Sequence, residues 1–110
     1  MTVDSETLVA AVTDPTRRQM LDLMLAHGET TATALAAELP VTRQAVAKHL
    51  AVLDRVGLVE GRREGREMRF HLNIARLDEA NRSLEELAAD WDRRLLAIKK
   101  LAEAERRRKR

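Results

Sequence analysis

The apolar residues of the chain recur mostly every three or four positions, which is the spacing of amphipathic helices. Four short helices are expected in its first half. Asp14 followed by Pro15 marks the start of the second helix, because aspartate caps helix N-termini and proline fits the first helical position. Gly28 and Gly57 suit the left-handed residue that ends a helix, so they close the second and fourth helices. The caps expected for the other three helices are Asp4 or Ser5, Thr30 or Thr31, and Thr42.

The spacing changes to alternation in residues 58–73, where Met68 and Phe70 are separated by polar side chains. A turn at Gly65 lies between the two apolar stretches, so this segment is expected to form a β-hairpin. Helical spacing resumes from about Leu77 and continues in one long final helix. The predicted fold class is therefore mainly α with a small β-hairpin, in the order α-α-α-α-β-β-α.

The length and composition are those of one globular domain. The chain has 110 residues, of which 45% are hydrophobic and 35% charged. We expect a single folded domain over residues 1–105 and a disordered basic tail at 106–110. The absence of cysteine excludes disulfides, thiolate metal sites, iron–sulfur clusters and cysteine nucleophiles. No apolar run reaches the roughly 18 residues of a membrane span, and no basic secretory signal region is visible, so the expected location is cytoplasmic.

The formal net charge of +2 is distributed unevenly. Residues 1–40 carry two basic and six acidic side chains, whereas residues 41–75 carry seven basic and four acidic ones. Residues 76–110 carry eleven basic and eight acidic side chains, and the last five residues are all basic. The local basic region at 41–75, more than the overall charge, indicates a nucleic-acid partner.

Two predicted helices lie within residues 30–57 and are separated only by Pro40 and Val41, which is the arrangement of a helix-turn-helix. The hairpin that follows carries arginines at its tip and would form a wing. This order is typical of winged helix-turn-helix proteins, whose recognition helix enters the major groove of double-stranded DNA. The side chains expected to contact DNA are Thr42, Arg43, Gln44, Ala47, Lys48 and His49 of the fourth helix, and Arg62, Arg63 and Arg66 of the hairpin.

These residue types suit different parts of DNA. Gln44 can read adenine and Arg43 can read guanine through paired hydrogen bonds, and both can also contact phosphate. Lys48 is expected to bind phosphate, and Arg66, at the turn, is the best candidate for a wing contact. The alternative for the hairpin is that its arginines form solvated salt bridges across the strands. His49 is expected to be structural or to donate a hydrogen bond to phosphate rather than to bind a metal.

Three sequence runs carry a resemblance to a known family: DPTRRQMLDLM, TALAAEL and VTRQAVAKHLAVLDRVGLVEGRREGREMRFHLN. In order and spacing they closely resemble the ArsR/SmtB-type bacterial transcriptional repressors, and the resemblance covers residues 8–101. It implies a winged helix-turn-helix homodimer with its N- and C-terminal helices at the interface. It also implies binding to imperfect palindromes in promoters.

The last helix carries an apolar stripe that is longer than the small core before it can cover. Trp91, the only tryptophan, lies in the middle of this stripe. We therefore expect the stripe to lie at a dimer interface rather than in the core of one chain. The residues expected at the interface are Leu8 and Val12 of the first helix and Leu84, Leu87, Trp91, Leu95 and Ile98 of the last.

The chain lacks the usual cysteine and histidine residues with which metal-sensing members of that family bind their effectors, although carboxylates are frequent on the last helix. The segment before the recognition helix reads AAELPVTR, without a cysteine, and the last helix has no histidine. The three histidines lie on separate predicted elements, with no pairing four residues apart on one helix. We therefore expect no metal site and no cofactor, and the sequence identifies no effector.

Catalytic signals are also missing, because the sequence has no glycine-rich phosphate loop, no metal-protease helix and no pairing of a nucleophile with a base. We expect a DNA-binding repressor and not an enzyme. Two alternatives stay open. One is a protein-interaction module built on a winged-helix fold, and the other is a metal-responsive repressor that uses oxygen ligands of its last helix.

Overall fold

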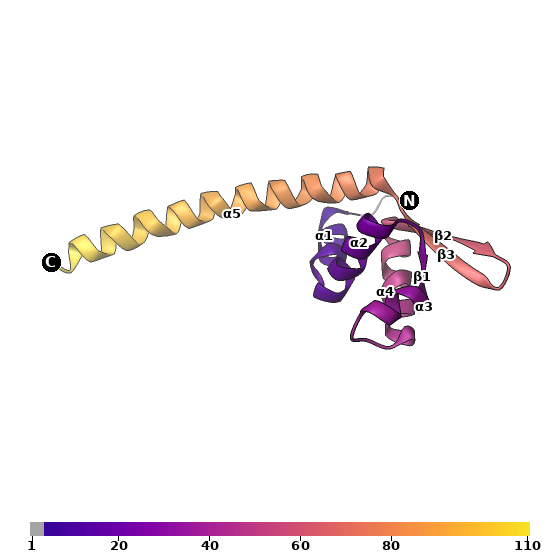
Figure 1. The fold of residues 1–110 in the computed structure, drawn as a ribbon. Helices are drawn as coiled ribbons and strands as arrows, with labels where there is room; N and C mark the ends of the chain where they lie inside the picture. Colours follow the sequence, from indigo (N-terminus) through magenta and orange to yellow (C-terminus); the bar gives the residue numbers. More distant parts are fainter. Residues whose placement is uncertain (1–3) are drawn as a thin grey trace. The chain divides into compact units, whose positions relative to one another are not determined.

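The computed structural model describes residues 4–110 and contains five helices and a small sheet within that range (Figure 1). Residues up to Ala80 form one compact unit and Asn81–Arg110 form another. The elements in chain order are α1 (Ser5–Thr13), α2 (Pro15–His27), β1 (Thr30–Thr31), α3 (Ala32–Glu38), α4 (Arg43–Arg55), β2 (Val59–Glu64), β3 (Glu67–Leu72) and α5 (Ile74–Arg108). The order of the helices and of the hairpin is the predicted one, which confirms the fold class.

The helix caps follow the local rules by which they were predicted. In each, a side-chain oxygen accepts a hydrogen bond of 2.8–3.1 Å from the backbone N–H three residues later, which satisfies a donor that the helix itself leaves free. The glycine after α2 has φ 84° and the glycine after α4 has φ 83°, so both adopt the left-handed conformation that was expected at these ends. The capping residues are Asp4, Asp14, Thr31 and Thr42.

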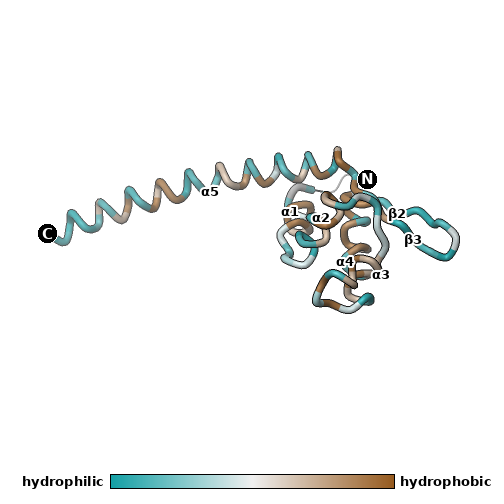
Figure 2. Tube along the Cα trace, viewed as in Figure 1, coloured by the Kyte–Doolittle hydropathy of each residue, from teal (hydrophilic) through white to brown (hydrophobic). Residues whose placement is uncertain are grey.

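The hydrophobic core lies between α2, α4 and the start of β2. Leu53, Leu58 and Val59 are fully buried, and α1 and α3 add further apolar side chains to the same cluster. Most of the hairpin, by contrast, is hydrophilic (Figure 2). The core therefore holds α4 by its inner face and leaves the hairpin exposed to solvent.

The sheet has three antiparallel strands, in the order β1-β3-β2, where the sequence predicts only the two of the hairpin. The third strand is short: Thr30 pairs with Phe70 and Thr31 pairs with Arg69. Two residues are too few to show an alternating pattern, so this strand carries no periodic signal. Through these pairs β1 connects the middle of β3 to the segment that precedes α3.

The long helix α5 begins and ends outside its predicted limits. It starts at Ile74, three residues before the expected start, because the side chain of Asn73 accepts a hydrogen bond of 3.1 Å from the backbone N–H of Arg76 and caps the helix. It ends at Arg108, inside the segment predicted to be a disordered tail. Basic side chains near a helix C-terminus are favourable, and Glu105 adds an ion pair to Arg108 at 4.0 Å.

Candidate nucleic-acid interface

The exposed side of α4 is built by its helical period. Val46, Leu50 and Leu53 are buried on one side, so the residues on the opposite side are held outward. These residues recur every three or four positions, and all of them are exposed. We call this surface the outer face of α4, and it consists of Gln44, Lys48, Ala51 and Arg55.

Arg43 lies beside the outer face rather than on it, because it precedes Gln44 by one residue and adjacent residues differ by about 100° around a helix. Its Nε donates a hydrogen bond of 2.9 Å to Oγ1 of Thr33 in α3. Ala47 is exposed and follows Arg43 by one turn on the same side. The structure thus separates Arg43 from Gln44, although sequence reasoning grouped them as two readers of bases.

His49 faces α2 and is half-buried. Its Nδ1 lies 3.2 Å from Nη1 of Arg17. Because a guanidinium only donates, Nδ1 accepts this hydrogen bond, and the ring proton of a neutral His49 is then on Nε2. Arg17 also donates to the carbonyl oxygen of Ala11 at 2.8 Å, so it pairs within the fold. The hydrogen bond to Arg17 fits a structural role for His49, which is one of the two roles expected from the sequence.

One carboxylate, that of Glu29, joins the loop before β1 to both strands of the hairpin. Its Oε1 accepts hydrogen bonds from Nη2 of Arg62 at 2.8 Å and from Nε of Arg69 at 2.9 Å. Hydrogen bonds from Arg69 and Arg62 hold the pKa of Glu29 below its ordinary value. Glu64 lies 3.4 Å from Arg62, and Glu67 lies 3.1 Å from Arg69. Three hairpin arginines were predicted to bind DNA, with salt bridges inside the protein as the alternative. Arg62 forms such salt bridges.

The other two predicted hairpin arginines, Arg63 and Arg66, are exposed. Among residues 4–110, neither has a carboxylate within ion-pair distance. Arg66 follows Gly65, whose φ of 61° closes the turn at the tip of the hairpin. The two guanidinium groups are thus available to an external anion, whereas Arg62 and Arg69 are held by carboxylates in the middle of the wing.

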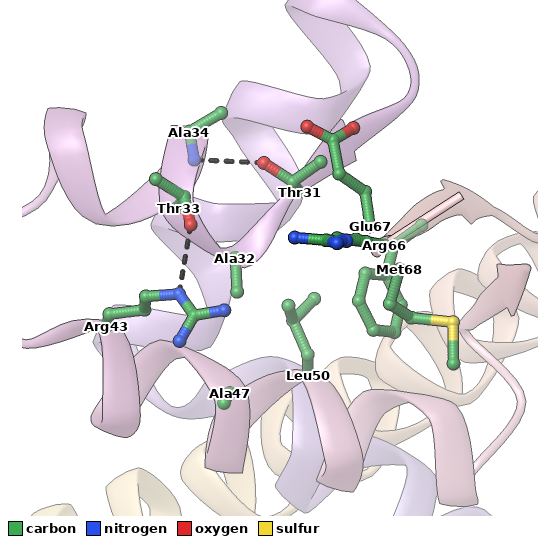
Figure 3. Close-up of a pocket in the computed structure, with 11 residues that line it drawn as sticks. Thr31, Ala32, Thr33, Ala34, Arg43, Ala47, Leu50, Arg66, Glu67 and Met68 are labelled. Atoms are coloured by element: carbon green, nitrogen blue, oxygen red, sulfur yellow. Dashed lines mark hydrogen bonds between the residues drawn. The ribbon is translucent and has the colours of Figure 1, made fainter. Parts of the chain in front are cut away.

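A groove of about 480 Å³ lies between α3, α4 and the start of β3. Arg43 enters it from one side and Arg66 from the other (Figure 3). The rest of its lining is mainly small or apolar, with the carboxylate of Glu67 at the edge. Sequence reasoning missed this groove, since its walls come from three elements that are far apart along the chain.

The apolar stripe of α5 is exposed in the single chain. Trp91 is 50% exposed and Ile98 is 57% exposed. In the other unit, Leu8 is buried in the core and Val12 packs partly against it. The exposed members of the predicted dimer interface are therefore those of α5, and hydrophobic residues recur along this helix (Figure 2). The α5 stripe consists of Leu84, Leu87, Trp91, Leu95, Ile98 and Leu101, of which Leu84 is half-buried.

Metal-binding clusters and membrane-spanning helices are both absent from the part of the chain that the structure describes. Within residues 4–110, no three or more histidine, aspartate or glutamate side chains are grouped so that they could hold a metal ion. No helix in this range combines the length and the apolar character that crossing a bilayer requires.

Known proteins resemble this chain over most of its length. Residues 12–62 match the family described as "Helix-turn-helix domain". The transcriptional repressor SdpR of Bacillus subtilis is 31% identical over 70 residues, which span 64% of this chain and 77% of the relative. The HTH-type transcriptional regulator Rv2034 of Mycobacterium tuberculosis is 35% identical over 95 residues, or 86% of this chain and 85% of the relative. Among solved structures, an ArsR-like transcriptional regulator from Rhodococcus sp. RHA1 is 45% identical, covers 89% of this chain and 92% of its own, and has a TM-score of 0.64.

Proposed function

Because this chain belongs to the ArsR family of winged helix-turn-helix regulators and is a DNA-binding transcriptional repressor, we propose that it acts as a homodimer on a pseudo-palindromic promoter operator. The observation that carries the proposal is the exposed outer face of α4, which is supported from behind by the core and flanked by the free arginines of the wing. Two copies of α4 would enter successive major grooves about 34–36 Å apart. Its place of action is the cytoplasm, where bacterial promoters lie.

Gln44 and Lys48 are the residues that we assign to the major groove. Both are exposed on the outer face, and the glutamine amide can accept from and donate to the edge of adenine. Lys48 lies one turn further along and supplies a positive charge for phosphate. Thr42 caps α4 and leaves its hydroxyl near the same end. From the wing, Arg63 and Arg66 supply the charges that reach the DNA backbone or the minor groove.

The test begins with duplexes that the unaltered protein selects from a random pool. Gln44→Ala should lose preference for the selected sequence, by roughly 1–3 kcal/mol at the affected base pair. Gln19→Ala removes another exposed glutamine, from α2, and should bind as the unaltered protein does. A Gln44→Ala protein that selects the same sequence with the same affinity would refute the assignment of α4. A folded protein that selects no duplex even at low salt would favour a protein-interaction module instead.

The spacing of α5 determines how two copies of this helix can pair. Positions that recur at alternate intervals of three and four residues form a seam along the helix. All of them are apolar except Arg94, and the seam consists of Leu84, Leu87, Trp91, Arg94, Ile98 and Leu101. In a parallel pair, Arg94 faces itself, and two like charges meet. In an antiparallel pair with its axis between Asp92 and Arg93, Arg94 faces Trp91 of the second copy, a favourable cation–π arrangement that the two residues already show within one chain at 5.2 Å. The remaining facing pairs are then apolar: Leu84 with Leu101 and Leu87 with Ile98.

Cysteine cross-linking can distinguish these two arrangements, because the chain has no cysteine of its own. A mixture of Leu87→Cys and Ile98→Cys chains should be joined efficiently by a short bismaleimide. Each variant alone should cross-link poorly, because in the antiparallel pair its two cysteines lie about 16 Å apart along the helix axis. The opposite result, with strong cross-linking of each variant alone, would show a parallel pair. A monomer in sedimentation equilibrium would refute the homodimer.

A further inference from the structure

The groove between α3, α4 and the wing has two guanidinium groups directed into it. Arg43 enters from α4 and Arg66 from the tip of the hairpin, on opposite sides of the groove (Figure 3). Neither forms an ion pair with a carboxylate among the described residues. The one acidic residue of the lining, Glu67, is already paired with Arg69 at 3.1 Å. The planar fork of arginine matches the oxygens of a phosphate, and two forks facing one another can hold one such group.

The other walls of the groove identify the rest of the ligand. The lining also includes Ala47, Leu50, Met68 and Phe70, which offer no charge. A free phosphate ion would leave this apolar floor in contact with water. A phosphodiester in a nucleic-acid strand would instead place a deoxyribose against the floor and its charged oxygens between the guanidinium groups. The lining therefore fits a segment of DNA backbone better than a small inorganic anion.

Thr33 determines where the guanidinium of Arg43 lies. Its Oγ1 accepts a hydrogen bond from Nε of Arg43, which holds the side chain against α3 and away from Gln44. No hydrogen bond to a described residue occupies the two terminal nitrogens of Arg43, so both can donate to a ligand. The guanidinium of Arg43 therefore already has a fixed orientation in the groove. It loses less conformational freedom on binding a ligand than an unrestrained arginine side chain does.

We propose that this groove binds a phosphodiester of the operator backbone, with Arg43 and Arg66 as its ligands and Thr33 as the residue that positions Arg43. The proposal rests on the proposed function, and it assigns Arg43 to phosphate, which is one of the two contacts expected for it from the sequence, and not to guanine. Base reading from α4 belongs to the outer face. The wing and the recognition helix thus contact the same segment of the DNA backbone from two sides.

The experiment compares binding to a selected duplex with binding to a scrambled one over a range of salt concentrations. Arg43→Ala and Arg66→Ala should each weaken binding to both duplexes by the same factor, about tenfold or more, because each protomer then makes one charge-assisted hydrogen bond fewer. The slope of log K against log salt should become shallower, by at most ~0.9 per phosphate, because the second arginine still contacts the shared phosphate in either single variant. The base preference should not change. Gln44→Ala is the comparator, since it should weaken binding to the selected duplex far more than to the scrambled one.

Thr33 is tested by replacement and rescue. Thr33→Ala should produce a smaller loss of affinity of the same kind, and Thr33→Ser, which keeps the hydroxyl, should restore binding. Because Thr33 is exposed, its variants should melt as the unaltered protein does. Neutral methylphosphonates placed one at a time along the duplex should reveal one position per half-site that weakens the unaltered protein more than Arg43→Ala, in which only Arg66 still contacts that phosphate.

Several results would overturn the proposal. One is a change of base preference at a single position in Arg43→Ala, which would make Arg43 a reader of bases. Another is a methylphosphonate scan in which Arg43→Ala and the unaltered protein respond alike at every position. Competition by inorganic phosphate at constant ionic strength that depends on Arg43, with no methylphosphonate effect, would assign the groove to a free anion. Failure of the unaltered protein to bind any duplex would instead remove the proposed function itself.

Discussion

Trp91 offers the sharpest quantitative test of self-association, because its side chain is large and 50% exposed in the single chain. A tryptophan buries roughly 150–250 Å² when it is fully covered, so about 100 Å² is available to a partner. At about 25 cal/mol per Å², and after allowance for the alanine that remains, Trp91→Ala should cost about 2 kcal/mol per protomer. A symmetric dimer contains the substitution twice, for a total of about 4 kcal/mol. The dimer dissociation constant should therefore rise about a thousandfold.

Sedimentation equilibrium over a dilution series measures this constant directly. The matched control is Leu96→Ala, since Leu96 is 53% exposed on the same helix but lies outside the seam. Its dissociation constant should stay within about threefold of that of the unaltered protein. Equal weakening by the two substitutions would mean that exposure of apolar surface, and not the seam, drives association. No weakening by Trp91→Ala would refute the interface.

Three further expectations concern stability and follow from single contacts. Glu29→Gln removes the carboxylate that accepts from Arg69 and Arg62, and it should lower the melting temperature at neutral pH. Because the pKa of Glu29 is lowered in the fold, its contribution is present above its unfolded-state value of about 4.5 and is lost as the pH falls through the folded-state pKa. Thermal unfolding at decreasing pH should show the two proteins converging, and a constant difference down to the acid transition would contradict this. Leu53→Ala empties a fully buried site and should cost about 2–5 kcal/mol in denaturant unfolding, whereas Leu25→Ala, at a residue that is 61% exposed, should change stability by less than about 0.5 kcal/mol. Thr42→Ala removes the cap of α4 and should cost about 1 kcal/mol in the same measurement, with Thr42→Ser retaining most of the stability.

The parts of the fold that the sequence predicts are those determined by neighbours along the chain. Helix caps join residues three positions apart, as Asp14 does with the backbone N–H of Arg17, and such pairs can be read directly from the sequence. The sequence did not predict β1 or the start of α5, because no clear pattern along the chain marks either of them. Thr30 and Thr31 are too short a segment to show a period, and the cap at Asn73 stands where the hairpin pattern still continues.

The candidate site is less predictable, because its contacts join residues far apart in sequence. Glu29 meets Arg69 only because β1 pairs with β3, and Arg43 meets Thr33 only because α3 packs against α4. Neither contact follows from the identity of the residues. The exposed outer face of α4 was predictable, since its period alone separates Gln44 from the buried side.

The arginines of this chain show why counting charge cannot locate a binding surface. Arg17 donates to carbonyl oxygens and Arg62 to a carboxylate, so their charges are satisfied where the fold places them. Arg43 and Arg66 have the same chemistry but reach a groove without a free carboxylate among the described residues. An arginine that the protein already holds must give up its partner before it can bind phosphate, and that exchange cancels much of the gain. We therefore expect DNA to bind the arginines that the fold leaves without an acidic partner, and only the folded chain distinguishes them.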